Sequence, residues 1–136
     1  MTWASAVPVL NVYLVVVGLI VGSFINLAAD RLPRRESVLA PPSHCRSCGR
    51  RLNALDLLPV AGYVARMGRC ATCGVPIGAA SLAVEAVSGA CMALALVWLG
   101  PWPGAAVGLA LVALWGLGVT GLALQRSRGS AQLRTP

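Results

Sequence analysis

Three long apolar segments dominate this sequence and make a lipid bilayer the medium in which the chain folds. They run from about Val9 to Ala28, from Leu82 to Leu99 and from Ala105 to Leu124. Each has about 18 residues or more, which matches a hydrocarbon core of about 30 Å at about 1.5 Å of helical rise per residue. The hydrophobic content of 57% agrees with this interpretation. The sequence therefore predicts an all-α membrane protein with three transmembrane helices.

Four of the five cysteines lie in the polar stretch between the first two apolar segments. They form two Cys-x-x-Cys pairs, Cys45 with Cys48 and Cys70 with Cys73, and a Gly follows each pair. Such pairs supply four thiolates at the spacing of tetrahedral zinc sites, and the Gly lets the backbone turn tightly around the metal. We therefore expect these four cysteines to bind zinc and to staple a loop that is too poor in apolar residues to fold alone. Redox-active or idle thiols are the alternative.

The distribution of arginine predicts how the chain is oriented in the membrane. The chain has no lysine and a formal net charge of +7, and eight of its 11 cationic residues lie between the first two spans. The other three follow the third span, whereas the N-terminal residues and the turn at 100–104 carry no charged side chain. By the positive-inside rule, the N-terminus and this turn face outward and the cysteine loop and C-terminal tail are cytoplasmic. Cytosolic thiols stay reduced, which favours metal binding over disulfides.

The expected organisation has four parts. These are residues 1–29 as the first transmembrane span, 30–80 as a cytoplasmic zinc-binding loop, 81–124 as the second and third spans, and 125–136 as a basic cytoplasmic tail. The tail is polar, and we expect it to be disordered. Gly18 and Gly22 stand four residues apart in the first span, a spacing that lets another helix approach closely.

Between the two cysteine pairs, apolar residues recur at helical spacing over residues 57–67. Asp56 is placed to cap the start of a helix there, and Gly68 is placed to end it. This pattern predicts a short amphipathic helix on the inner membrane face, with Arg66 and Arg69 directed toward lipid phosphates. Packing of the same helix against the cysteine loop is compatible with this arrangement.

Glu85 is the acidic residue with the most unusual position, close to the start of the second span. A carboxylate at that depth is costly unless it is paired, protonated or near water, so a functional role is the default expectation. Asn26 in the first span should lie at a similar depth, and a polar contact between Asn26 and Glu85 would tie the two spans together. Asp30 and Glu36 stand beside arginines near the membrane surface, where we expect solvated or ion-paired groups.

Taken together, these features resemble the N-terminal half of bacterial type IV prepilin peptidases, the bifunctional leader peptidase and N-methyltransferase enzymes. The matching elements, in order, are 22–26, 31–33, 43–49, 56–60, 68–77 and Glu85. This chain departs from the family pattern at Ala54-Leu55, where members of the family usually have aromatic residues. The proteolytic aspartates of the family lie in a further membrane domain, and this chain has no Asp or Glu after Glu85. We therefore do not expect aspartic peptidase activity from this chain alone.

The resemblance implies a role in type IV pilus or type II secretion, in the processing of prepilins or pseudopilins. It implies N-methylation of the new N-terminal amine from S-adenosylmethionine, with Glu85 as the catalytic candidate and Asn26 and Gly22 as candidates for substrate contact or helix packing. A separate aspartic peptidase subunit is the partner expected beside membrane lipid and the prepilin. The alternative is a non-catalytic scaffold that binds prepilin or assembly proteins through its zinc loop. Either role places the chain in the bacterial inner (plasma) membrane as a multi-pass protein.

A nucleic-acid partner is disfavoured, although cysteine ribbons and arginine clusters occur in proteins of that class. The arginines flank membrane spans, and Tyr63 is the only aromatic residue of the loop, which is too little for a stacking surface. Membrane topology and anionic lipid explain the charges more simply.

Overall fold

The computed structural model describes the backbone of residues 3–132 and the side chains of residues 6–129. Its elements are α1 (Trp3–Arg31), η1 (Leu32–Arg34), α2 (Ala54–Leu57), α3 (Ala61–Ala65), α4 (Ala80–Leu99) and α5 (Pro101–Gln132). Three of these helices are long and apolar enough to cross a membrane, and the described residues contain no strand longer than an isolated bridge. The predicted all-α fold with a cysteine loop between the first and second long helices is confirmed.

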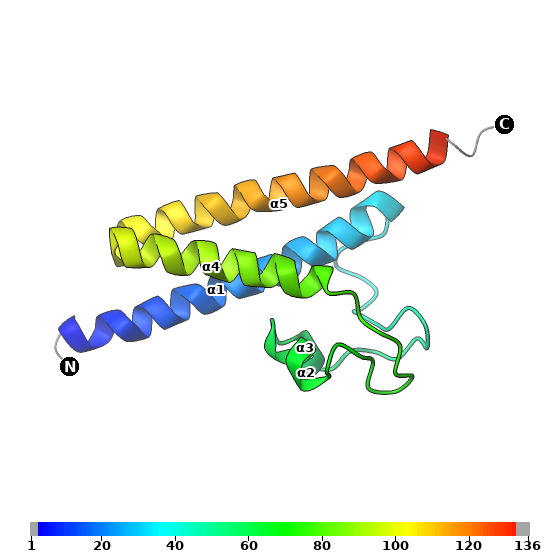
Figure 1. The fold of residues 1–136 in the computed structure, drawn as a ribbon, viewed down its shortest axis with the longest axis horizontal. Coiled ribbons are helices and arrows are strands. Elements are labelled where there is room, and N and C mark those ends of the chain that lie inside the picture. The colour runs from blue at the N-terminus through cyan, green and yellow to red at the C-terminus, as the bar shows by residue number, and fades with distance from the viewer. Residues whose placement is uncertain (1–2, 133–136) are drawn as a thin grey trace.

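The three long helices pack against one another in an antiparallel bundle, and each contacts the other two. Figure 1 shows the start of α1 and the α4–α5 turn at one end, with the cysteine loop and the end of α5 at the other. The 20 residues of α4 give a length of about 30 Å, the thickness of a hydrocarbon core. The cysteine loop therefore lies at one boundary of the membrane.

Small residues allow the helices to approach closely. A Cβ atom built on Gly22 would lie 2.7 Å from the Cβ of Ser88, and one on Gly18 would lie 2.9 Å from the Cβ of Met92. From α5, a Cβ on Gly108 would lie 2.7 Å from the sulfur of the same Met92. Met92 and Ser88 are fully buried as a result, which places the centre of the bundle along one face of α4.

Two expectations at the ends of α5 are wrong. The turn expected over 100–104 is reduced to Gly100, which has a φ of 77°, and α5 begins at Pro101. Proline suits this first position because its fixed φ is helical and its missing N–H would have had no partner in the helix. The tail expected to be disordered continues α5 as far as Gln132, since Ala, Leu, Gln and Arg are good helix formers. Residues 133–136 lie outside the described part of the chain.

The single helix expected over residues 57–67 is also wrong, because the structure divides it into α2 and α3. The break lies at Leu58, whose ψ of 121° is extended. A proline disfavours helical geometry in the residue before it, and Pro59 therefore ends α2 at Leu57. Val60 then turns the chain with a φ of 57° before α3 begins. Gly68, with a φ of 66°, ends the segment as expected.

Candidate metal centre and adjoining cavity

The two Cys-x-x-Cys segments form the same turn twice. In the first, the N–H of Gly49 donates to the carbonyl of Cys45 at 2.8 Å, and in the second the N–H of Gly74 donates to that of Cys70 at 3.0 Å. Gly49 and Gly74 both have φ near 70°, a left-handed conformation that glycine adopts without steric cost. We call these two turns and their flanks, residues 43–53 and 68–77, the cysteine ribbon.

The turns bring four sulfur atoms together, all within 4.8 Å of one another. The sulfurs of Cys45 and Cys73 are 3.8 Å apart, and those of Cys48 and Cys70 are 3.9 Å apart. A tetrahedral zinc ion with bonds of about 2.3 Å requires sulfurs about 3.8 Å apart. The donor set and its spacing therefore fit a zinc ion. Cys91 packs against the hydrophobic core instead.

The ribbon backbone favours the thiolate form of two of these cysteines. A backbone N–H of Cys73 lowers the pKa of Cys70 to about 6, and a backbone N–H of Cys48 lowers the pKa of Cys45. At Cys48 the N–H of Arg50 acts in the same direction, but desolvation and the neighbouring sulfurs outweigh it and raise the pKa to about 11. The ribbon backbone thus favours the thiolate form at Cys45 and Cys70, and the surroundings of Cys48 favour its thiol.

Asp56 connects the ribbon to the segment between its two halves. Its carboxylate accepts hydrogen bonds from Arg50 at 2.5 Å and Arg66 at 2.7 Å, and its side chain is only 6% exposed. The backbone N–H of Asn53 also donates to it, which completes a capping box with Asn53 at the N-cap of α2. Burial favours the neutral acid, but the Asn53 N–H and the two guanidinium groups outweigh this effect and lower the pKa of Asp56.

This arrangement corrects two expectations from the sequence. The N-cap of α2 is Asn53, and Asp56 supports it from the third helical position. Arg66 pairs with Asp56 instead of pointing toward lipid phosphates, because a buried carboxylate is the stronger partner.

A second ion-pair cluster joins the ribbon to the end of α1. Asp30 pairs with Arg34 at 3.1 Å and with Arg46 of the ribbon, and Arg46 also lies 3.5 Å from Glu36. The expectation that Asp30 and Glu36 are ion-paired is confirmed. Because all these side chains are nearly half exposed, the cluster positions the ribbon more than it stabilises the fold.

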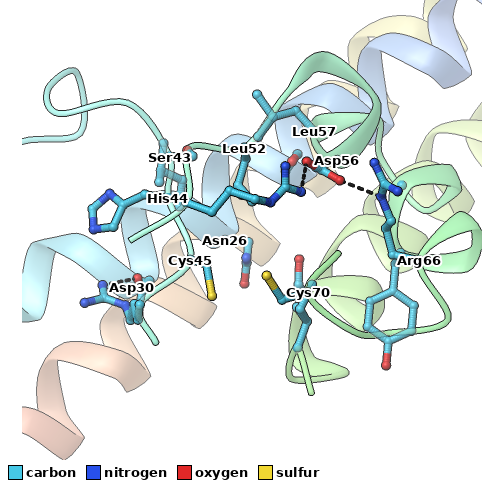
Figure 2. Close-up of a pocket in the computed structure, with 18 of the residues that line it drawn as sticks. Asn26, Asp30, Ser43, His44, Cys45, Leu52, Asp56, Leu57, Arg66 and Cys70 are labelled. Carbon is cyan, nitrogen blue, oxygen red and sulfur yellow. Dashed lines mark hydrogen bonds and ion pairs between the residues drawn. The ribbon is translucent and has the colours of Figure 1, made fainter. Parts of the chain in front are cut away.

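A cavity of about 450 Å³ lies between the ribbon and the bundle. Asn26 and Asp30 of α1, Cys45 and Cys70 of the ribbon, and Glu85 of α4 all line it. Figure 2 shows Asn26, Cys45 and Cys70 facing the same space. The cavity therefore places the candidate metal centre beside the polar residues of the first and second spans.

Glu85 is 7% exposed, and its Oε2 accepts a hydrogen bond from the backbone N–H of Val60 at 2.7 Å. The expected polar contact with Asn26 is absent from the hydrogen bonds of residues 6–129, because the carboxylate is directed to Val60. Within the same residues, Oε1 of Glu85 has no hydrogen-bond partner. Pro59 is the one sign of the Val60 contact that can be found in the sequence, because it marks the break where the N–H of Val60 becomes free.

The sequence of this chain is similar to the sequences of known proteins. The chain matches the family described as the Bacterial Peptidase A24 N-terminal domain over residues 16–99. The chain belongs to this family. The matched region contains all four ribbon cysteines as well as Asn26 and Glu85, so the whole candidate site lies within the A24 N-terminal domain.

The relatives are longer proteins. A prepilin leader peptidase/N-methyltransferase of Burkholderia pseudomallei is 37% identical over 114 residues, covering 65% of this chain and 37% of the relative. One of Myxococcus xanthus is 39% identical over 82 residues, covering 60% of this chain and 24% of the relative. A type 4 prepilin-like proteins leader peptide-processing enzyme of Escherichia coli is 29% identical, covering 83% of this chain and 47% of the relative. The chain thus spans less than half the length of each of these relatives. No solved structure is significantly similar to the chain.

Proposed function

We propose that this chain acts in the processing of type IV prepilins or pseudopilins, and that its cavity binds the N-terminal amine of a cleaved prepilin for N-methylation. The names of the relatives, which pair a leader peptidase with an N-methyltransferase, support the reaction class. The observation that supports amine binding in this cavity is the Glu85 carboxylate, which lies at the cavity wall.

Glu85 has the geometry to hold an amine. One carboxylate oxygen is fixed by the N–H of Val60, which orients the group, while Oε1 is left without a partner among the described residues. An ammonium group donates to such an oxygen, and the neutral amine is the nucleophile in methyl transfer. Glu85 would align the nitrogen and accept its proton, and Asn26 across the cavity would contact the peptide.

S-adenosylmethionine would supply the methyl group when bound. The amine nitrogen would take this methyl group, and the Glu85 carboxylate would accept the proton that the nitrogen gives up. This cofactor carries a carboxylate and a cationic sulfonium, and the cavity is lined by both guanidinium and carboxylate groups, including Arg46, Arg69 and Glu36. The lining thus offers cationic groups to the carboxylate of the cofactor and anionic groups to its sulfonium.

We assign the preceding peptide cleavage to a domain outside this sequence. An aspartic peptidase needs one ionised and one protonated carboxylate acting on the same water. Here Asp30, Glu36 and Asp56 each have arginine partners, and Glu85 holds the N–H of Val60. A peptidase domain on a longer chain or on a separate subunit would provide the pair.

We further propose that the ribbon binds zinc on the cytoplasmic side of the inner membrane. The sulfur spacing supports the metal, and the arginines between the first two spans support the orientation. The start of α1 and the α4–α5 turn would then face outward.

The experiment is methyl transfer in a reconstituted system. The purified chain is incubated with radiolabelled S-adenosylmethionine and a peptide bearing the N-terminus of a cleaved prepilin. We expect label on the α-amine, with E85Q reducing transfer about 100-fold as expected for loss of a general base, and with R51Q of the exposed ribbon surface unchanged. Absence of label with wild-type protein that still binds the peptide would contradict methylation and favour the scaffold function.

A further inference from the structure

The segment between the two halves of the ribbon has an inverted distribution of side chains. We call residues 54–67, which contain α2 and α3, the α2–α3 hairpin. All of its exposed side chains are apolar: Ala54, Leu55, Leu57, Leu58, Ala61, Val64, Ala65 and Met67. Its polar side chains, Asp56, Tyr63 and Arg66, are less exposed than these and line the cavity. Soluble helices show the opposite pattern, with polar residues outside.

Leu57 and Leu58 also line the cavity, but the exposure of the other apolar residues is substantial, at 46% for Leu55, 63% for Val64 and 84% for Met67. The neighbouring ribbon differs, because its exposed residues include Arg51 and Thr72. Two adjacent parts of one loop thus present surfaces of opposite character, one suited to water and the other to a hydrocarbon medium.

The bond between Val60 and Glu85 fixes the depth of the hairpin. Helix α4 begins at Ala80 and has the length of the hydrocarbon core, so its first residue marks the boundary of that core. Glu85 lies five residues farther along α4, about 7.5 Å along the helix axis. Val60 is hydrogen-bonded to the side chain of Glu85 and therefore lies within one side-chain length of that depth. Figure 1 shows α2 and α3 beside the first turns of α4.

The backbone N–H groups at the break in the hairpin are satisfied by protein, as such a position requires. Non-helical backbone is tolerated at membrane depth only where its polar groups are satisfied by protein. At the break between α2 and α3, the N–H of Val60 has the carboxylate of Glu85 as acceptor and the N–H of Gly62 has the carbonyl of Leu58 at 2.8 Å. Pro59 has no N–H to satisfy.

From these observations we infer that the α2–α3 hairpin is a re-entrant element immersed in the acyl-chain region of the leaflet beside the ribbon. Its outer face contacts lipid acyl chains and continues the lipid-facing surface of the bundle. Its inner face closes the cavity. The hairpin thus differs from a helix lying on the membrane surface, because its tip reaches below the headgroups.

Photocrosslinking tests this inference without disturbing the core. The photoreactive residue p-benzoyl-phenylalanine is placed at Val64 in the chain, which is reconstituted into nanodiscs of one phospholipid and irradiated. Intact mass analysis then detects adducts with the mass of that lipid. Phe24 on α1, 53% exposed, is the lipid-facing control, and Thr72 of the ribbon is the water-facing control.

We expect a lipid adduct at Val64 with a yield within about twofold of Phe24 and about tenfold above Thr72, as an acyl-immersed site requires. Zinc content of each variant shows whether the ribbon is intact. An adduct at Phe24 without one at Val64 would overturn the inference. A crosslink from Val64 to another polypeptide would overturn it as well, because a protein partner would then occupy this face.

Discussion

The carboxylate of Glu85 on α4 accepts a hydrogen bond from the backbone N–H of Val60, 25 residues earlier in the chain. The distance from the Val60 nitrogen to Oε2 of Glu85 is 2.7 Å. Val60 is a β-branched residue with a φ of 57°, a conformation that such residues rarely adopt without support from their surroundings. The hydrogen bond therefore holds an unfavourable turn in place. It also fixes the loop that carries the candidate metal centre to the membrane bundle.

Substitution of Glu85 separates the structural role of the carboxylate from its charge. E85Q keeps a carbonyl oxygen for the N–H of Val60, whereas E85L leaves that N–H without an acceptor. We expect E85L to lose about 1–3 kcal/mol of unfolding free energy, the cost of a buried unsatisfied donor, and E85Q to lose less. Thermal unfolding in nanodiscs measures the difference, and hydrogen exchange of residues 58–64 should accelerate in E85L. Equal destabilisation by both variants would show that the hydrogen bond is not the stabilising contact.

Removal of a ribbon sulfur should remove the metal. We expect purified wild-type chain to hold about one zinc ion per chain, and C70S to hold a small fraction of that amount. C91S is the control, since Cys91 lies in the core and outside the sulfur cluster. Elemental analysis of both variants in detergent provides the measurement. Loss of zinc from C91S, or full retention by C70S, would contradict the assigned ligand set.

Some parts of the molecule could be predicted from the sequence, and others could not. Spans and metal ligands follow from local rules, apolar length in one case and the spacing of cysteines in the other, so α1, α4 and the sulfur cluster were predicted. Pro59 carried enough information to place the break between α2 and α3, but the helical spacing of the apolar residues obscured it. The partner of Glu85 could not be predicted. A break of this kind frees backbone N–H groups, and only the tertiary fold determines which of them comes within reach of the carboxylate.

Acid should weaken the connection between the ribbon and the α2–α3 hairpin. The pKa of Asp56 is lowered in the folded state, so its ionised form stabilises the fold above its unfolded pKa of about 3.9. This stabilisation is lost as the pH falls below that value and through the lower folded pKa. We expect D56N to be less stable than wild type at pH 7 and the difference to shrink below about pH 4. Chemical unfolding of both proteins across this range gives the difference directly, and a gap independent of pH would contradict an ionised Asp56.

Close approach of α1 and α4 should make Gly22 intolerant of even a methyl group. A Cβ at this position would lie 2.7 Å from the Cβ of Ser88 and 3.1 Å from the Cα of Glu85, and the latter atom belongs to the backbone. The two helices would have to separate, so we expect G22A to lose about 1–3 kcal/mol of unfolding free energy, as overpacked cores do.

The control for this substitution is Gly118 of α5, where a Cβ would meet no atom within 4 Å. We expect G118A to be neutral or slightly stabilising, because alanine has the higher helix propensity. Because Glu85 lies opposite Gly22, G22A should also displace the carboxylate from Val60 and accelerate hydrogen exchange in the α2–α3 hairpin, whereas G118A should not. Unfolding curves and exchange rates that do not distinguish the two variants would show that α1 and α4 have room to accommodate the methyl group.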